Sequence, residues 1–182
     1  PSIPPGLPIT RADGQFGLFM ARYTLGHLLA ATQRLDACRE AQRERRWDSR
    51  LLPEDLTGQV ALVLGFGRIG RPIGRALREV GLEVHGFVRA PRGDAEFPLH
   101  GVPELGAWLG RARVFVLSAP LTPETRGLVD ARLLAGGHPR LVLVNVARGA
   151  LVVTAGLLEA LDAGRLERAV LDVFEEEPLP PE

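Results

Sequence analysis

The sequence contains no lysine, so all 22 of its Lys and Arg residues are arginine. This absence excludes Schiff-base chemistry on a lysine and a P-loop that relies on one. Basic and acidic side chains balance at 22 each, which argues against nucleic-acid and membrane-surface partners, because both need a basic excess. No apolar run approaches the roughly 20 residues that a membrane span requires.

Cysteine is nearly absent as well. The single Cys38 cannot form an internal disulfide or a cysteine-cluster zinc site, and we expect no metal. One thiol, with no signal-like leader, predicts a reducing and cytoplasmic setting. A length of 182 residues with 46% hydrophobic positions suits one globular domain, or one domain plus a fragment of another.

Residues 1–15 differ in character from the rest of the chain. Four prolines and one glycine among residues 1–10 predict an extended connector, and we expect it to come from a larger parent protein. A helical pattern of apolar residues then runs from Phe16 to Trp47, which predicts one long N-terminal helix.

Strands and helices alternate over the remainder. Apolar runs predict five strands, at residues 60–64, 83–88, 114–117, 141–146 and 169–173. Helical segments are expected between them, at 68–80, 103–109, 130–134 and 154–163, the last with Thr154 as N-cap and Gly164 as C-cap. This alternation predicts an α/β fold, a doubly wound parallel sheet of the Rossmann type.

The strongest local motif is the sequence GFGRIG, which follows the first predicted strand and precedes a helix. Gly65 permits the tight turn, Gly67 lets a pyrophosphate approach the backbone, and Gly70 lets helix and strand pack closely. The helix N-terminus adds N–H groups and the positive end of a dipole. The motif predicts dinucleotide binding; the alternative is a glycine-rich turn needed only for packing.

The end of the second strand indicates which dinucleotide binds. NAD enzymes usually place an acidic residue there to hold the ribose hydroxyls, but here Val88 and Arg89 occupy that place. Arg89 and Arg92 stand where a 2′-phosphate would lie, and guanidinium groups suit phosphate. We therefore predict NADP as the preferred cofactor, with NAD as the second choice. The alternative is that both arginines are only solvated.

Three further segments follow strands, and so fall at the carboxyl edge where ligands bind in such sheets. Residues 118–125 can cover the cofactor, or can form a structural turn with a capping Thr. Arg148 can bind a substrate carboxylate through two parallel hydrogen bonds. Asp172 and Glu177 can orient a cofactor amide or keep a catalytic histidine protonated, although an acidic run is commonly a solvated turn.

Together these segments resemble the D-isomer-specific 2-hydroxyacid dehydrogenase family, in the glyoxylate/hydroxypyruvate reductase branch. Four blocks carry the resemblance: LGFGRIG (64–70), PLTPETRGL (120–128), NVARGALV (145–152) and LDVFEEEP (171–178). The resemblance implies an oxidoreductase that moves a hydride between a nicotinamide cofactor and a small 2-oxo or 2-hydroxy acid. It also implies that residues 16–182 are the dinucleotide-binding domain, that the substrate domain is mostly absent, and that this domain forms a homodimer.

The resemblance also implies residue roles. Arg148 would bind the substrate carboxylate and polarise its carbonyl, Glu177 would pair with the catalytic histidine, and Asp172 would contact the nicotinamide carboxamide. Arg68 and Ile69 would lie against the pyrophosphate. Ala119, Val146 and Ala147 would line the nicotinamide and ribose site through backbone and small side chains, and Pro120 would also contact the cofactor.

The sequence also departs from the family pattern. The family's catalytic histidine follows the Glu-Pro block, whereas His27, His85, His100 and His138 all precede it, so we expect the chain alone to be inactive. Two other functions remain open. One is a module that senses a dinucleotide without turnover, although a sensor needs neither Arg148 nor Glu177. The other is a different Rossmann enzyme, such as a hydrolase acting on an NAD-linked intermediate.

Overall fold

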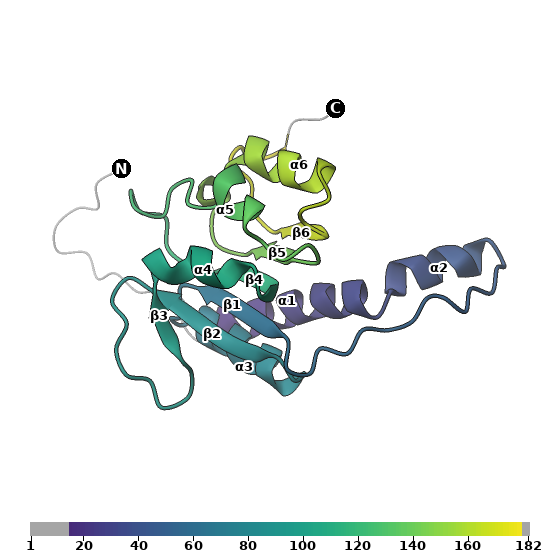
Figure 1. Cartoon of the computed structure of the whole chain (residues 1–182), viewed down its shortest axis with the longest axis horizontal. Helices are drawn as coiled ribbons and strands as arrows, with labels where there is room; N and C mark the ends of the chain where they lie inside the picture. Colours follow the sequence, from purple (N-terminus) through teal and green to yellow (C-terminus); the bar gives the residue numbers. More distant parts are fainter. Residues whose placement is uncertain (1–14, 180–182) are drawn as a thin grey trace.

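The computed structural model describes residues 15–179, and its centre is a six-stranded sheet in the order β3-β2-β1-β4-β5-β6 (Figure 1). All neighbouring strands are parallel. The strands are β1 (Val60–Leu64), β2 (Glu83–Val88), β3 (Leu99–Gly101), β4 (Ala112–Leu117), β5 (Val142–Asn145) and β6 (Arg168–Leu171). This order confirms the predicted doubly wound sheet, and it reverses between β1 and β4.

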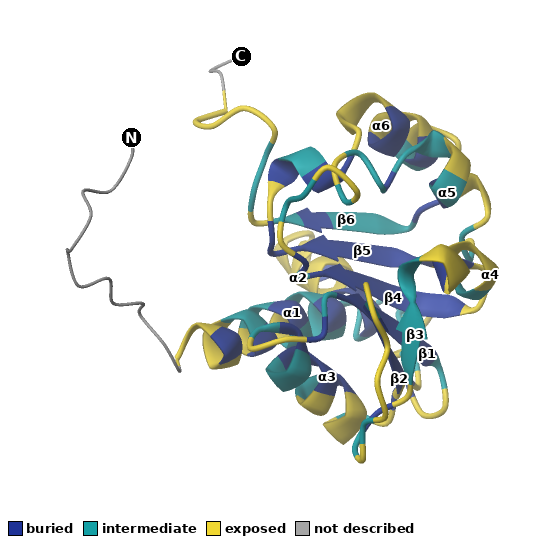
Figure 2. Ribbon diagram, turned by 90° about the vertical axis from the view of Figure 1, so that its left-hand side faces the viewer, coloured by how far each residue is buried: buried dark blue, intermediate teal, exposed yellow. Residues whose placement is uncertain are grey.

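Helices cover both faces of the sheet. Figure 2 shows α1 (Phe16–Thr32) and α3 (Gly70–Glu79) on one side, and α4 (Leu105–Leu109), α5 (Ala131–Ala135) and α6 (Thr154–Asp162) on the other. Alternate residues of each strand face opposite sides, so that Ala61 and Val63 pack with α1 and α3 while Leu62 and Leu64 pack with the other helices. Every residue of β1, β4 and β5 is buried, as expected for parallel strands.

The predicted single helix over residues 16–47 is wrong. α1 ends at Thr32, and a second helix, α2 (Leu35–Arg43), begins after Arg34, whose φ of 56° lies in the left-handed region. That backbone turn breaks the helical path although the apolar pattern continues. Residues beyond α2, including the exposed Trp47, return to β1 in an extended segment beside the helices (Figure 1).

Three smaller expectations also fail. Thr154 is not the N-cap of α6: Val153 holds that position, and the Thr154 hydroxyl instead donates a hydrogen bond to Glu175. Strand β3 lies outside the expected strands, because its three half-buried residues have no apolar run. Gly164 is not the C-cap of α6 either: Ala163 holds that position, and Gly164, with a φ of 64°, follows it. Within residues 15–179, no helix combines the length and apolarity that crossing a membrane requires.

Candidate functional site

The glycine turn after β1 has one open position between two crowded ones. A Cβ on Gly65, whose φ is 84°, would lie 2.5 Å from the Ala119 backbone, and a Cβ on Gly70 would lie 2.0 Å from the Gly65 carbonyl oxygen. A Cβ on Gly67 would meet nothing within 4 Å. The first and third glycines therefore allow close packing, while the exposed second one leaves space above the turn at the start of α3.

Phe66, the second residue of the motif, anchors this turn in the core. Its ring is buried, and a Cβ on Gly74 or Gly86 would come within 2.8 Å of it. The Phe97 ring packs on it edge-on, with the centroids 4.9 Å apart. Phe66 thus fills a slot between α3 and β2. The motif alone does not predict this role of Phe66, although a glycine inside a strand, such as Gly86, often marks such a close approach.

Ser118, just past β4, closes the other side of the turn. Its hydroxyl donates to the Gly65 carbonyl oxygen at 2.6 Å, and its backbone N–H donates to the Leu64 carbonyl oxygen at 2.8 Å. Ala119, which follows, is buried against the turn. These contacts fix the β1 and β4 ends beside each other, at the position where the strand order reverses.

Two arginines project from the segment after β2. Arg89 and Arg92 are exposed, and neither forms a hydrogen bond or ion pair with another residue in the described range. The N–H of Gly65 donates to the Phe87 carbonyl oxygen at 2.8 Å, so the end of β2, two residues before Arg89, lies beside the glycine turn. The pKa of Glu124 is lowered by a hydrogen bond from Thr122 and, more weakly, by the charge of Arg89.

The proline-containing loop after β4 is held by one threonine. The Thr125 hydroxyl accepts the N–H of Thr122 at 2.8 Å and donates to the Pro120 carbonyl oxygen at 2.8 Å. Residues 118–125 therefore do contain the capping threonine that we expected if this segment were a structural turn. Pro120 is exposed and follows Ala119, whose backbone lies against Gly65, so the loop can also cover a ligand at the glycine turn.

Arg148 is presented by a buried asparagine. The Asn145 side chain, at 0% exposure, accepts the N–H of Ala147 at 3.1 Å and donates to the Arg148 carbonyl oxygen at 3.0 Å. Arg148 itself is exposed, and its guanidinium donates to the Ala147 carbonyl oxygen at 2.6 Å. A guanidinium held in this way can bind a carboxylate through two parallel hydrogen bonds.

The acidic segment after β6 packs against the Arg148 loop. A Cβ on Gly149 would lie 1.9 Å from the Phe174 carbonyl carbon, so only glycine permits this approach. Glu177 is exposed and accepts the N–H of Phe174 at 2.7 Å, within its own turn. Asp172 is exposed beside Tyr23 of α1, where burial and the Asp172 charge together raise the pKa of the Tyr23 hydroxyl.

The predicted site residues therefore gather along one edge of the sheet, at the carboxyl ends of β1, β2, β4, β5 and β6. From β1 to β6 they are Gly65, Gly67, Arg68, Ile69, Gly70, Arg89, Arg92, Ala119, Pro120, Val146, Ala147, Arg148, Asp172 and Glu177. Among the described residues, no histidine forms a hydrogen bond with Arg148 or Glu177. His85 and His100 pair within the sheet, His27 contacts Tyr23 on α1, and His138 precedes β5.

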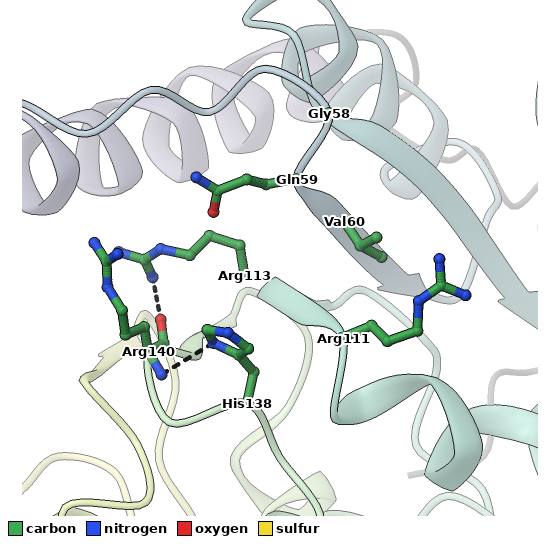
Figure 3. A pocket seen from close by; sticks show the side chains of 7 residues that line it. All are labelled: Gly58, Gln59, Val60, Arg111, Arg113, His138 and Arg140. Atoms are coloured by element: carbon green, nitrogen blue, oxygen red, sulfur yellow. Dashed lines mark hydrogen bonds between the residues drawn. The ribbon is translucent and has the colours of Figure 1, made fainter.

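A hollow of about 390 Å³ lies at the opposite edge, beside the first residues of β1 and β4 (Figure 3). The buried Arg113 beside it pairs with Glu54 at 2.8 Å and with Glu167 at 3.0 Å, and donates to the Arg140 carbonyl oxygen. These contacts occupy the Arg113 guanidinium. The hollow is therefore far from the predicted residues and is bordered by a charged network that joins distant parts of the chain.

Comparison with known proteins gives a consistent result. Residues 25–182 match the model of the D-isomer specific 2-hydroxyacid dehydrogenase, NAD binding domain. The chain is 38% identical over 180 residues to a glyoxylate/hydroxypyruvate reductase A from Photorhabdus laumondii. This match covers 98% of this chain and 57% of the relative. The chain thus spans little more than half of that relative's length.

Solved structures agree with this comparison. A family member from Aeromonas salmonicida is 39% identical, with a TM-score of 0.89 over 94% of this chain and 55% of that one. A second, from Xanthobacter autotrophicus in complex with NADPH and MES, is 36% identical, with a TM-score of 0.85 over 97% of this chain and 73% of that one. The chain belongs to the D-isomer specific 2-hydroxyacid dehydrogenase family and corresponds to its NAD-binding domain.

Proposed function

We propose that this chain binds NADP(H) across the carboxyl edge of its sheet and forms the coenzyme-binding part of a reductase for small 2-oxo acids, of the glyoxylate and hydroxypyruvate kind. Residues 16–182 would be the dinucleotide-binding domain, and residues 1–15 the connector to a substrate domain. NAD would bind more weakly. The observation that carries the proposal is the open space above Gly67, between two glycines that hold the turn closed.

This turn fits a pyrophosphate. Gly67 is exposed, and a Cβ there would occupy the space that a phosphate needs to reach the backbone. The ten-residue helix α3 begins at Gly70, so its first N–H groups and the positive end of its dipole lie at that space. Arg68 and Ile69 flank it and would contact the phosphates from the side.

Arg89 and Arg92 support the choice of NADP. They follow β2, where a dinucleotide places its adenosine ribose, and no acidic residue stands at Val88 or Arg89 to hold a 2′-hydroxyl. Both guanidinium groups are exposed, and their donors are not used by other described residues. The relative from Xanthobacter autotrophicus was itself solved with NADPH.

The chain's own residues would bind and orient the reactants. NADPH, when bound, supplies the hydride that reduces the 2-oxo carbonyl. Arg148 would bind the substrate carboxylate and stabilise the negative charge that develops on the carbonyl oxygen. Asp172 would accept a hydrogen bond from the carboxamide of the coenzyme, and Ala119, Val146 and Ala147 would line the ring and ribose with small side chains.

Glu177 would orient a protonated histidine, but His27, His85, His100 and His138 all precede the Glu177–Pro178 block, after which the family's catalytic histidine follows. We therefore expect the 182-residue chain to bind coenzyme without reductase turnover. The presence of both Arg148 and Glu177 at this edge favours a dehydrogenase over a module that only senses the dinucleotide, because a sensor needs neither group.

We also propose that the domain forms a homodimer through α1. Phe16, Leu18 and Phe19 on this helix are 60%, 48% and 51% exposed. Three large apolar side chains exposed together on the first turn of one helix are typical of a protein–protein contact.

The direct test is calorimetric titration of the chain with NADPH and with NADH. We expect NADPH to bind at least tenfold more tightly, because charge-assisted hydrogen bonds to a 2′-phosphate contribute about 1.5–3 kcal/mol. The double variant Arg89→Ala/Arg92→Ala should lose this preference and keep its NADH affinity, whereas Arg132→Ala, an exposed arginine of α5, should behave as the wild type. Tighter binding of NADH by the wild type would overturn the NADP assignment.

A further inference from the structure

The loop between β2 and β3 contains one carboxylate that binds three partners. The Asp94 side chain is only 11% exposed and forms a two-point ion pair with Arg71 of α3, with 3.2 Å from Nη1 to Oδ1. Its Oδ1 also accepts the backbone N–H groups of Glu96 and Phe97, at 2.9 and 3.1 Å. The Arg71 hydrogen bond is the main reason that the pKa of Asp94 is well below its usual range.

Glu96, two residues further on, binds the same helix. It pairs with Arg75 through both carboxylate oxygens, at 2.8 and 2.7 Å, and with Arg78 at 2.9 Å. These contacts, led by the Arg75 hydrogen bond, lower the pKa of Glu96 to about 2. Asp94 and Glu96 together therefore engage all three arginines that α3 presents to this loop.

The same segment is tied into the core. Phe97 is 4% exposed and packs against Phe66, the ring that anchors the glycine turn. Residues 89–93 thus run between two fixed points, the end of β2 at Val88 and the Asp94 contacts. Arg89 and Arg92 lie in this short span, and their guanidinium groups form no hydrogen bond or ion pair with other described residues.

We propose that Asp94 is a positioning residue that sets coenzyme specificity, by holding residues 89–93 so that Arg89 and Arg92 meet the 2′-phosphate. This inference rests on the proposed coenzyme site. Asp94 would act through the loop and not on the coenzyme, because Arg71 and two backbone N–H groups already bind its carboxylate oxygens. Fixing the loop before binding reduces the ordering cost of the two arginines.

The experiment compares two probes that differ by the 2′-phosphate: 2′,5′-ADP, which carries it, and 5′-AMP, which does not. Asp94→Ala should weaken binding of 2′,5′-ADP at least tenfold and change binding of 5′-AMP less than twofold. Asp94→Asn keeps the side-chain shape and an acceptor for the two N–H groups, so it should fold even where the alanine variant does not. It should show a smaller but equally selective loss.

The matched control is Asp130→Asn, which alters a carboxylate of similar local role, since Asp130 accepts the N–H of Leu133 at 2.8 Å at the start of α5. This variant should bind both probes as the wild type does. Equal losses for both probes in the Asp94 variants would show a merely structural role and would overturn the proposal, as would no loss at all. Failure of the underlying coenzyme assignment looks different, because the wild type itself would then not prefer 2′,5′-ADP.

Discussion

At the scale of single residues, the three glycines of the turn differ in how much space each leaves for a side chain. Gly65 and Gly70 are closed in by Ala119 and by the Gly65 carbonyl group, whereas the space beyond Gly67 is open. The sequence predicted this division of roles from the motif alone. It could not predict that Phe66, Ser118 and Asn145 fix the surrounding loops, because their partners are distant in sequence or are backbone atoms.

The contrast between Gly67 and Gly70 gives the first prediction. Gly67→Ala should leave the free energy of unfolding within about 1 kcal/mol of wild type, since its Cβ meets nothing, yet it should weaken NADPH binding at least tenfold by filling the phosphate space. Gly70→Ala should cost about 2 kcal/mol or more, because its Cβ overlaps a backbone oxygen. Urea unfolding and NADPH titration measure both effects. Wild-type NADPH affinity in Gly67→Ala would contradict the placement of the pyrophosphate.

At the scale of elements, five of the six strands were predictable because buried parallel strands are continuous apolar runs. Strand β3 is held differently. His100 on β3 and His85 on β2 share a hydrogen bond, with 2.9 Å between His85 Nδ1 and His100 Nε2, and Trp108 of α4 contacts both rings. Such pairing depends on tertiary structure, which local sequence patterns do not record.

This histidine pair predicts a pH-dependent stability. Burial lowers the pKa of His85, partly opposed by Glu83, which accepts its Nε2–H at 2.8 Å, while His100 and Arg111 add to the lowering. The unfolded chain has a histidine pKa of about 6.5, and the folded protein has a lower one. Above pH 6.5 both states hold His85 neutral, and its contribution to stability is complete. Below pH 6.5 the unfolded state binds the proton more readily, so this contribution is lost as the pH falls toward the pKa of the folded state.

We therefore expect the urea midpoint to be constant from pH 8 to 7 and to fall from pH 6.5 to 5. His85→Gln, which keeps hydrogen-bonding groups but does not titrate, should show a smaller fall over that range. His138→Gln, at a half-buried position near the opposite edge, is the control and should keep the wild-type slope. An identical slope in all three proteins would contradict the assignment to His85. Among the described residues, Glu104 is a further charged group near the pair, with its carboxylate 3.8 Å from His100 Nδ1.

The segment that returns from α2 to β1 is fastened by a buried ion pair. Arg113 is 2% exposed and binds both oxygens of Glu54, whose side chain is 8% exposed. We expect Arg113→Met to cost about 3–5 kcal/mol of unfolding free energy in urea, because it leaves a buried carboxylate with fewer partners. Adding Glu54→Met should recover part of this loss. Arg43→Met, at an exposed pair with Glu40, should cost about 1 kcal/mol or less; equal costs at the two sites would contradict the buried role.

At the scale of the whole molecule, the sequence was sufficient to predict the parallel sheet and the edge at which its motifs gather. Strand–helix alternation sets the topology, and the topology alone brings five strand ends together. The charged network at the opposite edge was not predictable, because Glu54, Arg113, Arg140 and Glu167 lie in separate segments that meet only after folding. The break at Arg34 was missed because the apolar pattern continues across it.

The last prediction concerns assembly through α1. Light scattering after gel filtration should give a mass near twice 19.7 kDa for the wild type, and a monomer for Phe19→Glu, which places a charge on the exposed apolar face. Leu158→Glu, at a similarly exposed leucine on α6, should remain dimeric, because α6 lies on the other side of the sheet (Figure 2). A monomeric wild type at tens of micromolar, or a dimer unaffected by Phe19→Glu, would contradict dimerisation through α1.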